Sequence, residues 1–160
     1  MPFNNLLLNC LIEGRSVKEN KRTVVVEKPE KNEIILFFKI DDQSNKRCTL
    51  RKAITLSGGI CDSIVFYSSE GQKKVCFVEL KGADIESAIK QVVNTYKNLK
   101  GAIKYNLSQT IEWKACILHG GAAPRLIKKE YRETLKKIFG KNGFKLSSGP
   151  RLDIGSFLRQ

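Results

Sequence analysis

Apolar positions in the middle of the chain recur with two different periods, and these periods predict its central elements. The runs Asp62–Tyr67 (DSIVFY) and Lys74–Lys81 (KVCFVELK) are rich in β-branched and aromatic residues, which is typical of strands. The polar stretch between them suits a hairpin connection. Over Asp84–Leu99 the apolar residues recur every three or four positions, which predicts an amphipathic helix capped by its first residue and stopped by Gly101.

The same patterns predict two further elements. Glu112–Leu118 (EWKACIL) has the composition of a strand, and Pro124–Phe139 has the spacing of a helix, with proline in its first turn and Gly140 at its end. The order strand, strand, helix, strand, helix predicts an α/β fold with a single mixed β-sheet flanked by helices. The first helix is long enough for a crossover, so the strands on either side of it can run parallel.

The N-terminal part predicts fewer elements. Thr23–Glu27 and Glu33–Ile40 have the composition of strands, and the turn residues between them predict a hairpin. Asn4–Ile12 suits a short helix. At 160 residues the chain fits one domain, residues 1–160, with a core over about 60–118 and a basic helical C-terminal part over 122–160.

The register of the central hairpin brings three charged residues to one end of the sheet. If the turn is centred on Glu70 and Gly71, Asp62 lies directly opposite Glu79. Lys81 shares their face, two residues further along the strand. The opposite face carries only apolar residues or tyrosine, so we expect helices to cover both faces; its residues are Val65, Tyr67, Cys76, Val78 and Leu80.

Composition limits the class of protein. An apolar fraction of 41% is that of a globular chain, and no apolar run is long enough to cross a membrane. The first residues lack the basic region and cleavage site of a signal peptide. Five widely spaced cysteines without a CxxC pair predict buried thiols and a reducing compartment, hence the cytoplasm. His119, the lone histidine, completes no zinc motif, and we expect it to be structural.

Charge is the first indication of function. The formal net charge of +13 favours polyanionic partners, usually nucleic acid. The alternative is a basic surface that only keeps the chain soluble. Ten of the basic residues follow Gly120, against three acids. Lys128, Lys129, Arg132 and Lys136 lie on one side of the second predicted helix, where they either contact phosphates or form a solvated face.

The opposed acids carry the chemistry. Two carboxylates facing each other across a strand pair repel, and partial burial raises the cost. A magnesium ion would relieve this repulsion, since it takes oxygen ligands from one or two carboxylates, waters and substrate phosphate. Lys81 would then act on a water at the metal or contact the scissile phosphate. The structural alternatives are a strand-end ion pair for Glu79 and Lys81, and a turn residue for Asp62.

At Asp62 in ICDSIVF and at Glu79-Leu80-Lys81 in CFVELKG, the sequence resembles the PD-(D/E)XK nuclease superfamily. The resemblance implies a restriction-endonuclease-like core (αβββαβ) and a hydrolase that cleaves DNA more often than RNA with magnesium or manganese. It also implies that Asp62, Glu79 and the Leu80 carbonyl bind the metal, that Lys81 serves the water, and that Gln91 supports the site from the following helix. Members of the superfamily often carry an acid on the first helix of the core, and Glu13 is the nearest candidate for it in this sequence.

The sequence is compatible with more than one mode of cleavage, assembly and function. Members of this superfamily act as endonucleases or exonucleases, as homodimers or within larger nuclease assemblies, and the sequence does not choose among them. One rival function is a non-catalytic nucleic-acid-binding protein on the same fold. A second rival is a protein-interaction module whose positive charge meets an acidic protein. Gln91 has its own alternative as a polar residue at the edge of the helix's apolar stripe.

Overall fold

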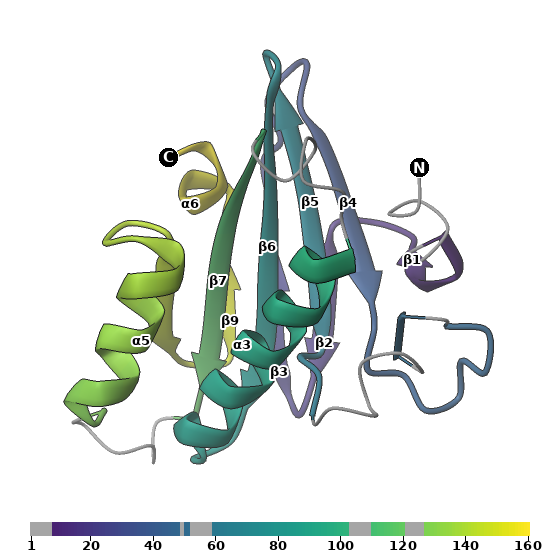
Figure 1. The fold of residues 1–160 in the computed structure, drawn as a ribbon. Coiled ribbons are helices and arrows are strands. Elements are labelled where there is room, and N and C mark those ends of the chain that lie inside the picture. Colours follow the sequence, from purple (N-terminus) through teal and green to yellow (C-terminus); the bar gives the residue numbers. More distant parts are fainter. Residues whose placement is uncertain (1–7, 49, 52–58, 103–109, 121–126) are drawn as a thin grey trace.

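The computed structural model describes residues 8–48, 50–51, 59–102, 110–120 and 127–160 (Figure 1). Their main elements, in chain order, are the 3₁₀ turn η1 (Leu8–Cys10), β1 (Leu11–Ile12), β2 (Ser16–Glu19), β3 (Arg22–Val25), β4 (Ile34–Lys39), β5 (Ser63–Ser69), β6 (Gln72–Lys81), α3 (Ile85–Ala102), β7 (Ile111–His119), α5 (Lys129–Phe139), β8 (Phe144–Ser148), β9 (Arg151–Asp153) and α6 (Gly155–Arg159).

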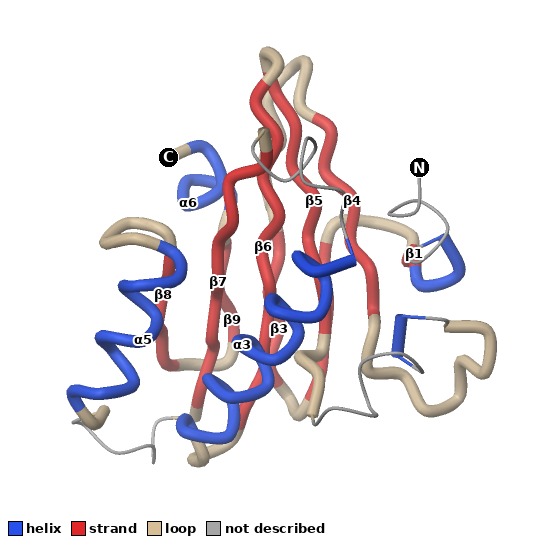
Figure 2. Tube along the Cα trace, in the orientation of Figure 1, coloured by secondary structure: helices blue, strands red, loops and turns tan. Residues whose placement is uncertain are grey.

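The main sheet has six strands in the order β1-β4-β5-β6-β7-β8. Strands β4, β5 and β6 form an antiparallel meander, whereas β6, β7 and β8 run parallel. Helices α3 and α5 lie on one face of this sheet (Figures 1 and 2). The predicted α/β fold, a mixed sheet flanked by helices, is therefore confirmed, and so is the parallel pairing across the α3 crossover.

The register of the β5–β6 hairpin also follows the prediction. Ile64 pairs with Phe77 and Phe66 pairs with Val75, in a ladder that ends at Ser63 opposite Val78. Just beyond it, the backbone nitrogen of Asp62 donates to the Glu79 carboxylate, as the same register requires. Glu70 and Gly71 both have positive φ, 49° and 82°, as the two central residues of a type I′ turn require. This tight turn fixes the pairing, because a slip of one residue would exchange the two faces of the strand.

Helix α3 packs its apolar stripe onto the main sheet, around an aromatic cluster in which Tyr96 meets Phe77 and Trp113 edge-on. The backbone nitrogen of Ser87 donates to Asp84 Oδ1 at 3.0 Å, so Asp84 caps the helix as expected. The predicted stop at Gly101 is wrong, since the helix continues through Ala102. Glycine only lowers helix propensity here, because its φ is not positive.

The predicted N-terminal hairpin is wrong. Strand β3 pairs with β2 and β9 in a separate three-stranded sheet, while β4 pairs with β5 and β1 in the main sheet. Thr23–Glu27 and Glu33–Ile40 both contain strands as predicted, but these strands belong to different sheets. Strand β3 packs against the main sheet rather than pairing with β4, which buries Val24 between the two sheets. The predicted short helix is also wrong over its described part, where residues 8–10 form η1 and 11–12 form β1; its residues 4–7 lie outside the described residues.

We expected helices to cover the second face of the main sheet, and this prediction is only partly right. The three-stranded sheet β2-β3-β9 lies across it, as Figure 1 shows behind β6, and α6 adds Phe157 and Leu158. These residues bury the predicted apolar face, including Val65, Val78 and Leu80. Short segments from both ends of the chain therefore complete the core, through contacts that are distant in the sequence.

The C-terminal part differs from the predicted basic helical segment. Helix α5 begins at Lys129, residues 127–128 are not helical, and the predicted start at Pro124 lies outside the described residues. Strands β8 and β9 follow α5 and extend both sheets. All five cysteines are free and buried, as predicted. Among the described helices, none is both long and apolar enough to cross a membrane.

Candidate functional site

Asp62 and Glu79 face each other where β5 begins and β6 approaches its end. The backbone nitrogen of Leu80 donates to Asp62 Oδ2 at 2.7 Å, and the backbone nitrogen of Asp62 donates to Glu79 Oε2 at 3.1 Å. Each acid is thus held by the backbone beside the other acid. This reciprocal arrangement fixes one oxygen of each carboxylate and leaves Asp62 Oδ1 and Glu79 Oε1 without a backbone donor among the described residues.

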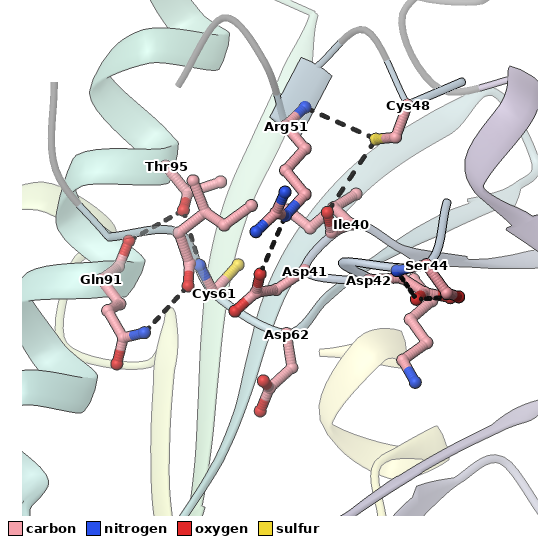
Figure 3. Close-up of polar contacts among 12 residues, drawn as sticks. Ile40, Asp41, Asp42, Ser44, Cys48, Arg51, Cys61, Asp62, Gln91 and Thr95 are labelled. Carbon is pink, nitrogen blue, oxygen red and sulfur yellow. Dashed lines mark hydrogen bonds and ion pairs between the residues drawn. The ribbon is translucent and has the colours of Figure 1, made fainter. Parts of the chain in front are cut away.

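Lys81 joins the same cluster, and Gln91 holds it there. Lys81 Nζ lies 3.6 Å from Glu79 Oε1 and donates to Gln91 Oε1 at 2.8 Å. Gln91 Nε2 in turn donates to the Ile60 carbonyl at 3.0 Å, so the amide bridges the lysine and the segment before Asp62. Figure 3 shows the Gln91 side chain on α3 pointing toward the segment that leads into Cys61 and Asp62. Gly59 makes room for it: a Cβ on Gly59 would lie 3.0 Å from Gln91 Cγ.

Burial sets the electrostatics of the two acids. Glu79 is 2% exposed. Desolvation raises its pKa to about 8, the Asp62 charge adds to this, and the Lys81 ammonium opposes it. Desolvation likewise raises the pKa of Asp62 to about 6, while the hydrogen bond from the Leu80 amide lowers it. Burial and mutual repulsion therefore both disfavour ionisation of the two acids at once.

A polar cavity of about 410 Å³ opens onto this cluster. The predicted catalytic and metal-binding residues all line it: Asp62, Glu79, Leu80, Lys81 and Gln91. The cavity also has lining residues that the sequence analysis missed, namely Glu19, Asn20, Lys39 and Asp41 with the loop 42–44. Figure 3 shows Asp41 close to Asp62 and opposite Arg51, whose Nε lies 3.2 Å from Asp41 Oδ1.

The missed residues come from the N-terminal third of the chain. Glu19 and Asn20 lie at the tip of the β2–β3 hairpin, where Asn20 and Lys21 both have positive φ. Asn20 Nδ2 reaches the Leu80 carbonyl at 3.5 Å. An asparagine that tolerates positive φ was the available sequence signal for this turn, but nothing local indicated that the turn would reach the site. Glu13, the predicted acid, is exposed in a bend and does not line the cavity.

The donor set of the cavity fits a hard divalent cation. It offers the buried Glu79 carboxylate, the half-buried Asp62 carboxylate and the Leu80 carbonyl, all oxygen donors, and the two acids are destabilised by desolvation and mutual repulsion. Within the described residues, no group of three acidic, histidine or cysteine side chains could hold a metal ion by themselves. Magnesium commonly binds through only one or two carboxylates, completed by waters and substrate phosphate.

The predicted nucleic-acid-binding residues lie outside this cavity, on α5 and just before it. Lys128 Nζ pairs with Glu86 Oε1 at 2.9 Å, which joins the start of α5 to the start of α3. Lys129 and Arg132 are exposed on α5, and Lys136 Nζ lies 4.0 Å from Glu133. The structure therefore gives Lys128 an internal partner and leaves Lys129 and Arg132 facing solvent.

His119 lies closer to the cluster than its sequence position suggested. It is the register partner of Lys81 across the β6–β7 pair. Its Nδ1 lies 2.9 Å from the Gly120 carbonyl oxygen, which can only accept, so Nδ1–H is the donor of this hydrogen bond. This local hydrogen bond agrees with the expected structural role.

Protein-family models, curated proteins and solved structures were compared with this chain, and none of them matches it.

Proposed function

We propose that this protein is a metal-dependent nuclease that hydrolyses phosphodiester bonds, with DNA preferred over RNA as substrate. One observation carries the proposal: Asp62, Glu79 and Lys81 converge in one polar cavity, with Lys81 Nζ 3.6 Å from Glu79 Oε1. The backbone grips both acids through 2.7 and 3.1 Å hydrogen bonds, so the cluster is preorganised at the end of two paired strands.

The electrostatics support the same function. Two acids whose pKa values are raised by burial are costly to ionise, and a divalent cation offsets that cost directly. Perturbed acids in a cleft are more typical of functional sites than of structural ion pairs. The chain's net charge of +13 favours a polyanionic substrate, although the cavity itself is rich in acids.

Each residue then has a separate task. Asp62, Glu79 and the Leu80 carbonyl would hold Mg²⁺ or Mn²⁺, and the ion would supply a Lewis acid that lowers the pKa of a water bound to it. Lys81 orients that water or contacts the scissile phosphate with its ammonium. Gln91 fixes Lys81 through the 2.8 Å hydrogen bond between Gln91 Oε1 and Lys81 Nζ. In the hydrolysis, a water oxygen forms a bond to phosphorus and the bond between phosphorus and one sugar oxygen breaks. The departing sugar oxygen takes up the proton that the water loses.

The proposal also covers the family of the fold, the residues that bind the nucleic-acid backbone, the cellular location and the assembly. The αβββαβ core of restriction-endonuclease-like proteins would include the β4–β5–β6 meander, α3 and β7. Lys129 and Arg132 on α5 would hold the nucleic-acid backbone without selecting a sequence. We also propose a cytoplasmic location, because all five cysteines are free, and we allow a homodimer or a larger nuclease assembly.

A cleavage panel tests the function. Single- and double-stranded DNA and RNA are incubated with Mg²⁺, with Mn²⁺ and with a chelator, using the wild type, Glu79→Gln and Lys81→Ala. We expect metal-dependent cutting by the wild type and a loss of at least about 100-fold in both variants, with nucleic-acid affinity kept. Glu27→Gln is the matched control, because Glu27 pairs with Arg151 outside the cavity.

The same panel separates the rival functions. Nucleic-acid binding without metal-dependent cutting on any substrate would favour the non-catalytic binding protein. Absence of salt-dependent binding to either nucleic acid would favour the protein-interaction module, since phosphate contacts give a steep dependence on salt. Cutting that persists at wild-type rates in Glu79→Gln and Lys81→Ala contradicts the assigned site.

A further inference from the structure

An ion pair between the two sheets lies at the rim of the cavity. Lys39 ends β4 and Glu19 ends β2, and Lys39 Nζ lies 3.3 Å from Glu19 Oε2. Both residues line the same cavity as Asp62 and Glu79. Lys39 is the register partner of Ser63, so its backbone lies next to the strand position that follows Asp62.

The position of Glu19 is electrostatically unfavourable for the site. Its carboxylate lines a cavity that already contains four other acids, namely Asp41, Asp42, Asp62 and Glu79. The pair itself is about one-third exposed, 32% for Lys39 and 37% for Glu19, and such pairs stabilise folded proteins little. Stability therefore does not account well for a further carboxylate in this cavity, whereas control of the Lys39 ammonium does.

We propose that Glu19 is an internal substitute for a substrate phosphate: it holds Lys39 in the free protein, and Lys39 transfers to a backbone phosphate when nucleic acid enters the cavity. A carboxylate oxygen and a phosphate oxygen are equivalent partners for an ammonium group, and they compete for it. Lys39 is then a substrate-binding residue and Glu19 its competitor. The inference rests on the proposed function, because it takes nucleic acid as the occupant of the cavity.

A double-mutant cycle on binding tests this competition. Wild type, Glu19→Gln, Lys39→Ala and the double variant are titrated against a labelled DNA duplex and its single strand over a range of salt. The titrations contain Ca²⁺ in place of Mg²⁺, so that binding is measured without relying on cleavage. Glu27→Gln is the matched control, because it removes the same charge from an ion pair of 3.0 Å outside the cavity.

We expect Glu19→Gln to tighten binding by about two- to fivefold, the range expected when an exposed ion pair no longer opposes it. Lys39→Ala is expected to weaken binding and to reduce the salt slope by about one. In the Lys39→Ala background, Glu19→Gln is expected to have no more effect than Glu27→Gln. That loss of effect distinguishes competition for Lys39 from a general change in net charge.

Three outcomes overturn the inference: equal tightening by Glu19→Gln in both backgrounds, no tightening beyond Glu27→Gln, or no binding of either strand by the wild type. If Glu19→Gln only lowers the thermal unfolding midpoint, the pair is a structural link between the sheets. Coupled binding without cleavage under Mg²⁺ supports the inference and rejects the nuclease. Cleavage without coupling supports the nuclease and rejects the inference.

Discussion

The backbone nitrogen of Asp62 donates a 3.1 Å hydrogen bond to the carboxylate of Glu79, so the strand that carries one acid also positions the other. This contact requires the register in which the two residues face each other, and a shift of one position would break it. The hairpin therefore determines both the fold of the central strands and the geometry of the site.

Magnesium affinity should depend steeply on pH. The pKa of Glu79 is raised to about 8 and that of Asp62 to about 6, so below pH 8 the cation must displace a proton. We expect affinity to rise by up to about tenfold per pH unit from pH 6 to 8, and to level off above. Isothermal titration calorimetry at several pH values measures this. Asp62→Asn should lose most of the binding, and a flat pH profile contradicts the prediction.

Stability of the metal-free protein should fall as pH rises through the same range. Glu79 binds its proton more tightly folded than unfolded, with a pKa of about 8 against 4.5, so its contribution is complete below about pH 4.5 and is lost toward pH 8. Urea unfolding between about pH 5 and 8.5 measures the effect. Glu79→Gln should flatten the decline and exceed the wild type in stability near pH 8. An equally steep decline in this variant shows that other groups cause it.

Gln91 should act through Lys81 rather than on the metal. Gln91→Ala removes the 2.8 Å partner of the ammonium, and we expect kcat to fall by about 10- to 100-fold with magnesium affinity kept. Gly59→Ala should reproduce this loss, because the new Cβ would lie 3.0 Å from Gln91 Cγ. If Gln91→Ala and Gly59→Ala disrupt the same contact between Gln91 and Lys81, the double variant should be no slower than either single variant. Strictly multiplicative losses, or a parallel loss of magnesium binding, contradict this.

The basic residues of α5 should contribute affinity without specificity. Lys129→Ala and Arg132→Ala are each expected to lower the salt slope of DNA binding by about one, equally for unrelated sequences. Lys128→Ala should change it less, because Glu86 already holds that lysine at 2.9 Å. Lys73→Ala is the matched control, since Lys73 is exposed near the hairpin turn at the far end of β6. If the salt slope of DNA binding is unchanged in both Lys129→Ala and Arg132→Ala, the basic face of α5 is only solvated and does not contact phosphates.

The sequence predicted those parts of the fold whose contacts are local. The β5–β6 register follows from one tight turn and the alternation of apolar residues, and α3 follows from its apolar period and the Asp84 cap. The N-terminal hairpin prediction was wrong because β3 and β4 have similar compositions, and composition does not identify a strand's partner. Pairing of β3 with β9 joins residues more than 120 positions apart.

The sequence by itself determined that Asp62, Glu79 and Lys81 share one end of one face, because a two-residue turn and a period of two leave no other arrangement. Tertiary structure alone decided what surrounds them. Glu19 arrives from a second sheet, Gln91 bridges to Ile60, and burial shifts the two acids' pKa values. Those relationships depend on packing between distant segments, and desolvation is a property of the assembled core rather than of any local pattern.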